Sequence, residues 1–321
     1  MYIDSRRQSC IRRQEANGAP PVSAAFEHPE VALEDIEVSA DTLDIEQAVA
    51  IYREHGCLVV RGLMTAYLDE MRSQIDRLID ESIGMLDRAK KVDEGWMTPN
   101  SALFIPAPKN FARDKQLMCL PMHYRNSSVL LQAAMDSRTL ELVGAVLGPN
   151  VELFMEGQAL VKEPVGGHPK HLHQDASYFE HKYEGPMAQL NYVVDTDLNN
   201  GALHVVPGSF KLGLLQHVDT FSHLGLAGDE WPWERALPVV GKAGDSIFFH
   251  VKCIHGSKPN WSHQPRPVYI NRYRRADDYV VVSATTTAKR AAAEKKRGQA
   301  SKEHQLGLMV RGFRDHDSER G

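Results

Sequence analysis

The sequence predicts a mostly β protein with flanking helices, in which the helices pack on one face of an antiparallel sandwich or jelly roll. Segments with helical spacing of apolar residues lie before residue 150, and from Val151 onward the pattern changes to short β-rich segments. Strong turn signals, Asn-Asn-Gly at 199–201 and Pro-Gly-Ser at 207–209, separate the later segments. A chain that places helices first and strands afterwards favours this α+β architecture.

The first regular elements are expected directly after residue 40. Residues 44–55 show helical spacing and begin with an acidic residue, which suits the positive end of a helix dipole, and Gly56 ends the segment. A short strand is expected at 57–62. Thr65 is a candidate N-cap for a second helix, which extends to about residue 83.

The middle of the chain is expected to hold one irregular segment and one more helix. Residues 93–122 contain four prolines and lack clear periodicity, so they are expected to form a long irregular segment at the mouth of a site. A third helix is expected at 136–147. The strands expected after it lie at 151–161, 189–194, 202–206, 246–249 and 268–273.

Composition shifts near both ends predict three parts. Residues 1–40 are polar and are expected to form a loosely ordered arm or an edge-wrapping segment. Residues 41–283 are expected to form a single domain with its jelly-roll core from about residue 151. Residues 284–321 form a basic C-terminal extension, in which 289–302 carry six basic residues against one acid. This stretch is interpreted as a solvated helix or tail, with a flexible lid or contact arm as the alternative.

Composition also excludes several classes of protein. The 321 residues carry a net charge of −5, which argues against a general nucleic-acid binder. No apolar run approaches the roughly 18 residues that span a bilayer, and the N-terminus lacks the apolar core of a secretory signal. The four cysteines show no Cys-x-x-Cys pairing, which favours free thiols in a reducing compartment. We therefore expect a cytoplasmic protein with no membrane contact. The cysteines are Cys10, Cys57, Cys119 and Cys253.

Two short segments 80 residues apart predict a metal centre. His173 and Asp175 form a His-x-Asp motif, and His255 follows far downstream. On an extended strand, positions i and i+2 face the same side, so both side chains of the motif would reach one ion. Two imidazoles and one carboxylate form the facial triad of non-haem Fe(II) oxygenases, which leaves positions for co-substrate and O₂.

An arginine and a serine strengthen this prediction. Arg266 lies 11 residues after His255, and Ser257 lies two residues after it. A guanidinium grips a carboxylate in a bidentate fork, as the far end of a 2-oxoglutarate co-substrate requires while its keto-acid end chelates iron. The residues therefore predict an Fe(II)- and 2-oxoglutarate-dependent oxygenase.

Other arrangements of histidines stay open at this point. One alternative is that His171 and His173 form the pair of histidine ligands. The other is that no metal binds, so that His173 and His255 are structural residues of a β core and Asp175 caps a turn. The remaining histidines of the second half are expected on the surface or in packing contacts, with His250 in the core or beside the ligands: His168, His181, His204, His250 and His263.

The chain resembles the phytanoyl-CoA dioxygenase family over roughly residues 45–280. The resemblance rests on the His-Gln-Asp motif, the run NNGALHVVPGS at 199–209, the segment from His255 to Arg266 and the opening GCLVVRGL at 56–63. It implies a double-stranded β-helix with flanking helices. It also implies His173, Asp175 and His255 as iron ligands, with Arg266 and Ser257 on the distal carboxylate of 2-oxoglutarate. Related halogenases replace the acidic ligand with a small residue, so Asp175 favours hydroxylation.

Further residues are weaker candidates. Phe179, six residues after the first histidine, has the spacing of an aromatic residue that lines the co-substrate site in some relatives, and a core phenylalanine is the alternative. Gln158 and Lys162 precede the motif on one strand face and are expected near co-substrate or substrate. Gln174 points away from the metal by strand parity, although in relatives it sits near the co-substrate.

The substrate is the least determined feature. Arg272 and Arg274 share a strand face with Arg266, so one of them is expected to meet an anionic group of a small-molecule substrate. The alternative is that they emerge at the rim and pair with Asp277 or Asp278. Two tryptophans of the 210–235 loop, Trp231 and Trp233, are expected either at the mouth of the site or in packing contacts.

Three kinds of function fit these residues. The first is a dioxygenase that hydroxylates a small molecule and releases succinate and CO₂. The second has the same cofactor chemistry with desaturation, cyclisation or epimerisation as its outcome. The third is a metal-binding barrel without catalysis, against which the intact set of His173, Asp175, His255 and Arg266 argues.

Overall fold

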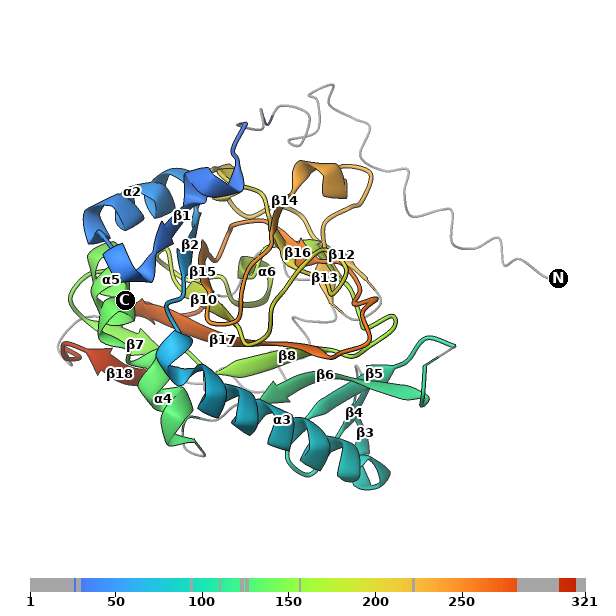
Figure 1. The fold of residues 1–321 in the computed structure, drawn as a ribbon. Helices are drawn as coiled ribbons and strands as arrows, with labels where there is room; N and C mark the ends of the chain where they lie inside the picture. Colours follow the sequence, from blue (N-terminus) through green and yellow to red (C-terminus); the bar gives the residue numbers. More distant parts are fainter. Residues whose placement is uncertain are drawn as a thin grey trace.

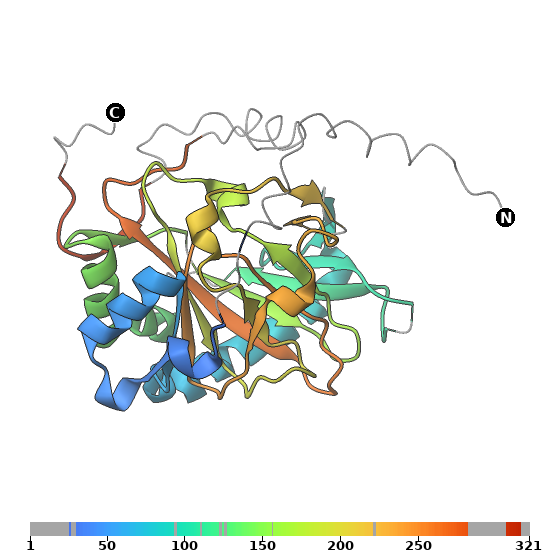
Figure 2. The same cartoon turned by 90° about the horizontal axis from the view of Figure 1, so that it is seen from above.

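Two β-sheets face each other, and helices cover the outer face of the larger sheet (Figure 1). The computed structural model describes residues 26, 30–92, 95–109, 111–121, 124, 127–155, 157–220, 223–281 and 306–315. Figures 1 and 2 show helices α2 (Ile45–His55) and α5 (Ser137–Leu147) at one end of the molecule and strands β3–β6 at the other. Strand β17 (Arg266–Arg275) runs between the two ends.

The larger sheet has the order β1-β2-β15-β10-β17-β8-β6-β5-β4-β3, and β7 joins β17 to β18 beside this path. Its pairs are antiparallel except for β1 with β2. The strands are β1 (Glu37–Ser39), β2 (Cys57–Arg61), β3 (Lys90–Val92), β4 (Gly95–Met97), β5 (Leu103–Pro106), β6 (Lys115–Pro121), β7 (Val151–Leu153), β8 (Gln158–Lys162), β10 (Met187–Tyr192), β15 (Ser246–His250), β17 and β18 (Leu308–Arg311).

The smaller sheet has the order β14-β11-β16-β9 and closes over the inner face of the larger one. This two-sheet arrangement is the jelly roll that the sequence predicts. The strands are β9 (Lys170–His173), β11 (Leu203–Val205), β14 (Leu237–Val239) and β16 (His255–Ser257), and a separate hairpin pairs β12 (Val218–Asp219) with β13 (Leu224–Gly225). The other helices are α3 (Leu68–Gly84), α4 (Ser128–Ala134) and α6 (Ala176–Phe179).

Local capping explains where the predicted helices begin. The carboxylate of Asp44 accepts hydrogen bonds from the backbone N–H groups of Glu46 and Gln47, and α2 starts directly after it. Asp136 caps α5 in the same way. The expected cap at Thr65 is wrong. Its hydroxyl donates to the Gly62 carbonyl instead, and a 3-10 turn separates it from α3.

The expectation of irregular structure at 93–122 is also wrong. The segment contains β4, β5 and β6, which extend the larger sheet. Its prolines fit because Pro106 and Pro121 are the last residues of their strands, whereas Pro99 and Pro108 lie in the connections. The single strand expected at 151–161 is divided into β7 and β8.

Both outer parts of the chain contribute to the larger sheet. In the predicted N-terminal arm, Ile36 is fully buried and β1 lies at the sheet edge, which agrees with the edge-wrapping alternative for that portion. In the C-terminal extension, β18 pairs with β7, which sequence patterns did not predict. The basic stretch 289–302 lies outside the described residues, and the extent of the single domain stays a prediction.

Two apolar cores lie on opposite faces of the larger sheet. One joins the sheet to the inner sides of α2, α3, α4 and α5, and includes Tyr52, Met71 and Leu142. The other lies between the two sheets and includes Leu190, Leu203 and Phe249. No helix of the described residues is long and apolar enough to span a bilayer. The cytoplasmic location stays a prediction.

Candidate active site

Two histidines face each other across the smaller sheet. His173 ends β9, His255 begins β16, and the two are direct partners in the antiparallel pair, with ring centroids 4.3 Å apart. Nδ1 of His173 lies 2.8 Å from the carbonyl oxygen of His171, and Nδ1 of His255 lies 2.9 Å from that of Cys253. Because a carbonyl only accepts hydrogen bonds, Nδ1 of each ring carries the proton and Nε2 presents a lone pair to the cluster.

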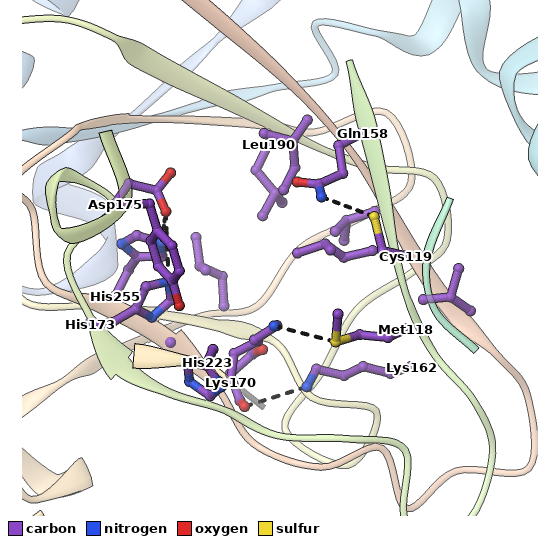
Figure 3. Close-up of a pocket in the computed structure, with 18 of the residues that line it drawn as sticks. Met118, Cys119, Gln158, Lys162, Lys170, His173, Asp175, Leu190, His223 and His255 are labelled. Atoms are coloured by element: carbon purple, nitrogen blue, oxygen red, sulfur yellow. Dashed lines mark hydrogen bonds and ion pairs between the residues drawn. The ribbon is translucent and has the colours of Figure 1, made fainter. Parts of the chain in front are cut away.

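Asp175 completes the cluster by a different geometry from the one predicted. Strand β9 stops at His173, and Asp175 has right-handed helical dihedrals (φ −59°, ψ −28°) at the start of α6, so strand parity does not position it. Its Oδ1 lies 3.7 Å from Nε2 of His173 and 3.8 Å from Nε2 of His255. Across the described part of the chain, this trio is the group of potential ligands that could hold a metal ion, with ligand atoms within 4.8 Å of one another (Figure 3).

The protonation states suit a divalent metal. Burial raises the pKa of Asp175, but neighbouring positive charge, foremost the guanidinium of Arg272, outweighs it and holds that pKa well below its usual range. Burial, together with neighbouring His173, lowers the pKa of His255 to about 4. An ionised carboxylate and neutral imidazoles are the forms that bind metal, so the donor set fits Fe(II).

The rival pair of ligands is not supported. The side chain of His171 is exposed, and only its carbonyl takes part, as the acceptor for His173. His250 is buried, in agreement with the core alternative, and its Nδ1 accepts a hydrogen bond from the Lys252 backbone. His168 was expected on the surface or in packing, but it is buried and lines the cavity described next.

A cavity of about 470 Å³ lies between the two sheets and contains the cluster. Its volume falls within the range of small-molecule sites. Figure 3 shows His173, Asp175 and His255 on one side and Gln158, Cys119 and Lys162 on the other. Much of the remaining wall is apolar and includes Leu103, Met118, Leu160, Leu190, Phe249 and Ile270.

Arg266 and Ser257 are both buried in the cavity wall. The guanidinium of Arg266 donates to the carbonyls of Asn200 and Gly201, which fixes its plane and leaves further donors of the fork for a carboxylate. Burial lowers the pKa of Arg266 to about 10, so the group stays cationic at neutral pH. Ser257 is two residues after His255 on β16, and both side chains reach the cavity.

Three weaker candidates also line the cavity. Lys162 is paired with Arg266 across β8 and β17, and its Nζ donates to the carbonyls of His168 and Ser257. The amide of Gln158 lies 2.9 Å from the thiol of Cys119. Phe179 packs edge-on against Phe154, with ring centroids 5.4 Å apart.

The two arginines predicted for substrate have different positions. Arg272 lines the cavity, and its Nη2 lies 3.3 Å from Oδ2 of Asp175. Arg274 is fully buried in an ion pair with Glu152 and is not among the described residues that line the cavity. Both arginines are buried rather than exposed at the rim, and Asp277 forms an ion pair with Arg275.

Other predicted contacts are not made. Gln174 points away from the cavity, as strand parity predicted, and its amide bonds the carbonyls of Gly213 and Lys252. Trp231 is buried in an apolar cluster, and Trp233 packs edge-on against His204. The packing alternative for the two tryptophans is therefore correct.

Lys170 and His223 line the cavity but were not predicted. Lys170 begins β9, three residues before the first histidine, and its Nζ lies 3.6 Å from Sδ of Met118 on the opposite wall. The ring of His223 lies 5.4 Å from that of His173. Strand parity places Lys170 on the opposite face from His173, and the pairing of β9 with β16 shifts register between these two positions, so sequence spacing offered no signal for Lys170. A loop histidine such as His223 has no signal either.

A jelly roll with two imidazoles and one carboxylate around an open cavity defines the class of non-haem iron oxygenases. The model of the family "Phytanoyl-CoA dioxygenase (PhyH)" matches residues 52–268. Peroxisomal phytanoyl-CoA dioxygenase of Rattus norvegicus is 26% identical over 282 residues, covering 81% of this chain and 77% of the relative. The probable alpha-ketoglutarate-dependent hypophosphite dioxygenase of Stutzerimonas stutzeri is 24% identical over 230 residues, and the alignment covers 67% of this chain and 79% of the relative.

Among solved structures, the epimerase SnoN in complex with Fe³⁺, alpha ketoglutarate and nogalamycin RO aligns with a TM-score of 0.59. The alignment covers 84% of this chain and 96% of SnoN at 19% identity, so it supports the fold. The chain belongs to the phytanoyl-CoA dioxygenase family. The predicted family, fold class, enzyme class and cofactors are therefore confirmed.

Proposed function

We propose that this enzyme hydroxylates a small molecule, with Fe(II) held by His173, Asp175 and His255 and with 2-oxoglutarate as co-substrate. The convergence of two Nε2 atoms and one carboxylate oxygen within 4.8 Å, at the wall of the cavity between the two sheets, carries this proposal. With 2-oxoglutarate and O₂, the bound iron would supply the oxidising power, and the co-substrate would leave as succinate and CO₂.

The protein supplies position and exclusion of water. The carbonyls of His171 and Cys253 hold the two imidazoles in the tautomer that binds metal. Arg266 is the proposed partner of the distal carboxylate of 2-oxoglutarate, with Ser257 as a second donor. Both are buried, so the ion pair would form away from bulk water, where it is stronger.

An anionic group on the substrate is part of the proposal. Three cationic side chains line the described cavity, Lys170, Arg266 and Arg272, against one carboxylate, Asp175, whereas burial holds the pKa of a further basic residue, Lys162, well below its usual range. Iron and 2-oxoglutarate carry opposite double charges, so their binding together leaves this positive excess in place. Lys170 is the proposed partner of the substrate anion because it enters the cavity between its two walls (Figure 3).

The first test is an anaerobic titration of the apo-protein with Fe(II) and 2-oxoglutarate, followed by absorption spectroscopy. A weak visible charge-transfer band at about one equivalent of each is expected. The Asp175→Ala variant is the matched control and should give no such band. A folded parent protein without the band would contradict the assigned site.

Product analysis tests the outcome of the reaction. Substrate candidates with a carboxylate or phosphate group are screened by succinate release, and the product is analysed by mass spectrometry. Hydroxylation predicts a gain of one oxygen atom. A product of unchanged mass would instead indicate epimerisation. A product lighter by two hydrogens would indicate desaturation or cyclisation. The name of SnoN shows that an epimerase has this fold.

A further inference from the structure

The two oxygens of Asp175 lie in different surroundings. Oδ1 faces the two Nε2 atoms, at 3.7 and 3.8 Å. Oδ2 faces away from them toward Arg272, whose Nη2 donates to it at 3.3 Å. A carboxylate can bind a metal through one oxygen or through both, and here a buried guanidinium engages the second oxygen.

Arg272 is held firmly enough to keep this contact. Its backbone lies in the centre of the larger sheet, where it pairs with Ala188 on β10, and its carbonyl accepts the N–H of Phe154. The guanidinium carbon lies 5.4 Å from the centre of the Phe179 ring, which packs in turn on Phe154. The side chain is therefore fixed from the strand and from α6, the helix that begins after Asp175.

We propose that Arg272 is a positioning residue that reserves Oδ2, so that Asp175 offers the metal one oxygen and an adjacent coordination position stays open for the co-substrate. The inference rests on the metal site of the proposed function. It assigns Arg272 to the acidic ligand and leaves recognition of the substrate anion to Lys170.

The existing contact with Asp175 argues against Arg272 as the residue that meets the substrate. The residue is 8% exposed, and its Nε is enclosed without a hydrogen-bond acceptor among the described residues. Its Nη2 is already engaged by Oδ2 of Asp175, so a substrate anion would have to compete with that carboxylate for the guanidinium.

The test uses the full chain loaded with Co(II), whose visible d–d bands report the number and arrangement of ligands. In Arg272→Met the freed carboxylate is expected to change this spectrum, and the dissociation constant of 2-oxoglutarate is expected to rise about 10–100-fold. Arg272→Lys, which keeps one charged donor, should recover part of both properties. An unchanged Co(II) spectrum in Arg272→Met, or an effect confined to the KM of the substrate, would overturn the inference.

Lys170→Met is the matched control for charge, because it removes one cation from the same cavity without touching Asp175. It should leave the Co(II) spectrum unchanged. If it weakened 2-oxoglutarate as much as Arg272→Met does, charge alone would explain the result and the inference would fail.

A double-mutant cycle tests whether Arg272 acts through Asp175. In an Asp175→Asn background, which keeps one ligand oxygen but replaces the oxygen that accepts from Arg272 by an amide nitrogen, Arg272→Met should change the Co(II) spectrum and the affinity for 2-oxoglutarate much less than it does in the parent. The same changes in both backgrounds would contradict the inference. These readouts do not require turnover. Absence of succinate release with the expected spectra would count against the proposed function alone, whereas unchanged spectra in an active enzyme would count against the inference alone.

Discussion

Strand β17 carries two arginines two positions apart, Arg272 and Arg274, and each pairs with a buried carboxylate. The two pairs differ in whether arginines engage one or both oxygens of the carboxylate. Arg272 meets Asp175 at 3.3 Å beside the cavity, where Oδ1 of the carboxylate stays directed at the imidazoles. Arg274 meets Glu152, its direct neighbour on β7, at 2.7 Å, and Arg314 binds the other oxygen of Glu152. The first pair leaves a donor atom available, whereas the second uses both oxygens.

The difference shows which buried charge is available for chemistry. Glu152 and Arg274 are fully buried, Nη1 of Arg274 also meets Nε2 of His181, and the guanidinium lies 4.6 Å from the centre of the Phe154 ring. Such a network is expected to contribute to the stability of the fold. Asp175 keeps an unshared oxygen at the cavity, so its loss should remove activity while the fold survives.

Asp175→Ala or His255→Ala is expected to have the largest effect, the loss of succinate release, because each variant removes one of three metal ligands. Thermal unfolding followed by circular dichroism is the control, and both variants should unfold cooperatively as the parent does. Full turnover by either variant would show that the ligands are assigned incorrectly.

Glu152→Ala should destabilise the fold by about 3–5 kcal/mol, because it leaves two guanidinium groups beside an empty buried position. Urea unfolding measures this free energy. Co(II) binding at a temperature where the variant is folded should resemble that of the parent. If Glu152→Ala had normal stability and impaired metal binding, the Glu152–Arg274 pair would serve the metal site rather than the stability of the fold, which would contradict the comparison.

Arg266→Ala should raise the requirement for 2-oxoglutarate. Loss of charged hydrogen bonds costs about 1.5–3 kcal/mol, which corresponds to roughly a 10–100-fold increase in KM for the co-substrate. Steady-state kinetics of succinate release measures it, and Arg266→Lys should be intermediate because it keeps the charge but loses the fork. Unchanged dependence on 2-oxoglutarate would move the carboxylate anchor to another residue.

Asp277→Asn should have the smallest effect. Asp277 pairs with Arg275 at the end of β17, and both side chains are more than one third exposed. Exposed pairs of this kind contribute about 0–1 kcal/mol, so urea unfolding and turnover should both stay close to the parent values. A loss comparable to that of Glu152→Ala would mean that burial does not separate the pairs on this strand.

Local signals predicted the fold best. Helices α2 and α5 begin at an acidic cap and end before a glycine, and such signals need no tertiary information. Strands β5 and β6 could not be predicted because each ends at a proline and neither shows a clear period, and they depend on pairing with β4 and β8. Strand β18 follows a basic segment and gains its partner, β7, from more than 150 residues upstream.

The chemistry of the site was more predictable than its geometry. The spacing of His173, Asp175, His255 and Arg266 identified residues that the fold does bring to one cavity. Strand parity was the wrong reason for Asp175, because β9 ends before it. Arg272 and Arg274 share a strand face, yet only contacts with α6 and β7 decide which of them reaches the metal site.

The carbonyl groups that fix His173 and His255 have a consequence for the metal content of the protein. Each imidazole is oriented by the backbone two residues before it, so the ligands are arranged before any ion arrives. A ready set of two nitrogens and one oxygen is also suited to Co(II), Ni(II) and Cu(II), and selectivity among divalent metals depends strongly on their availability. The ion found in a purified sample will therefore reflect the growth medium, and reconstitution from apo-protein should precede any measurement of activity.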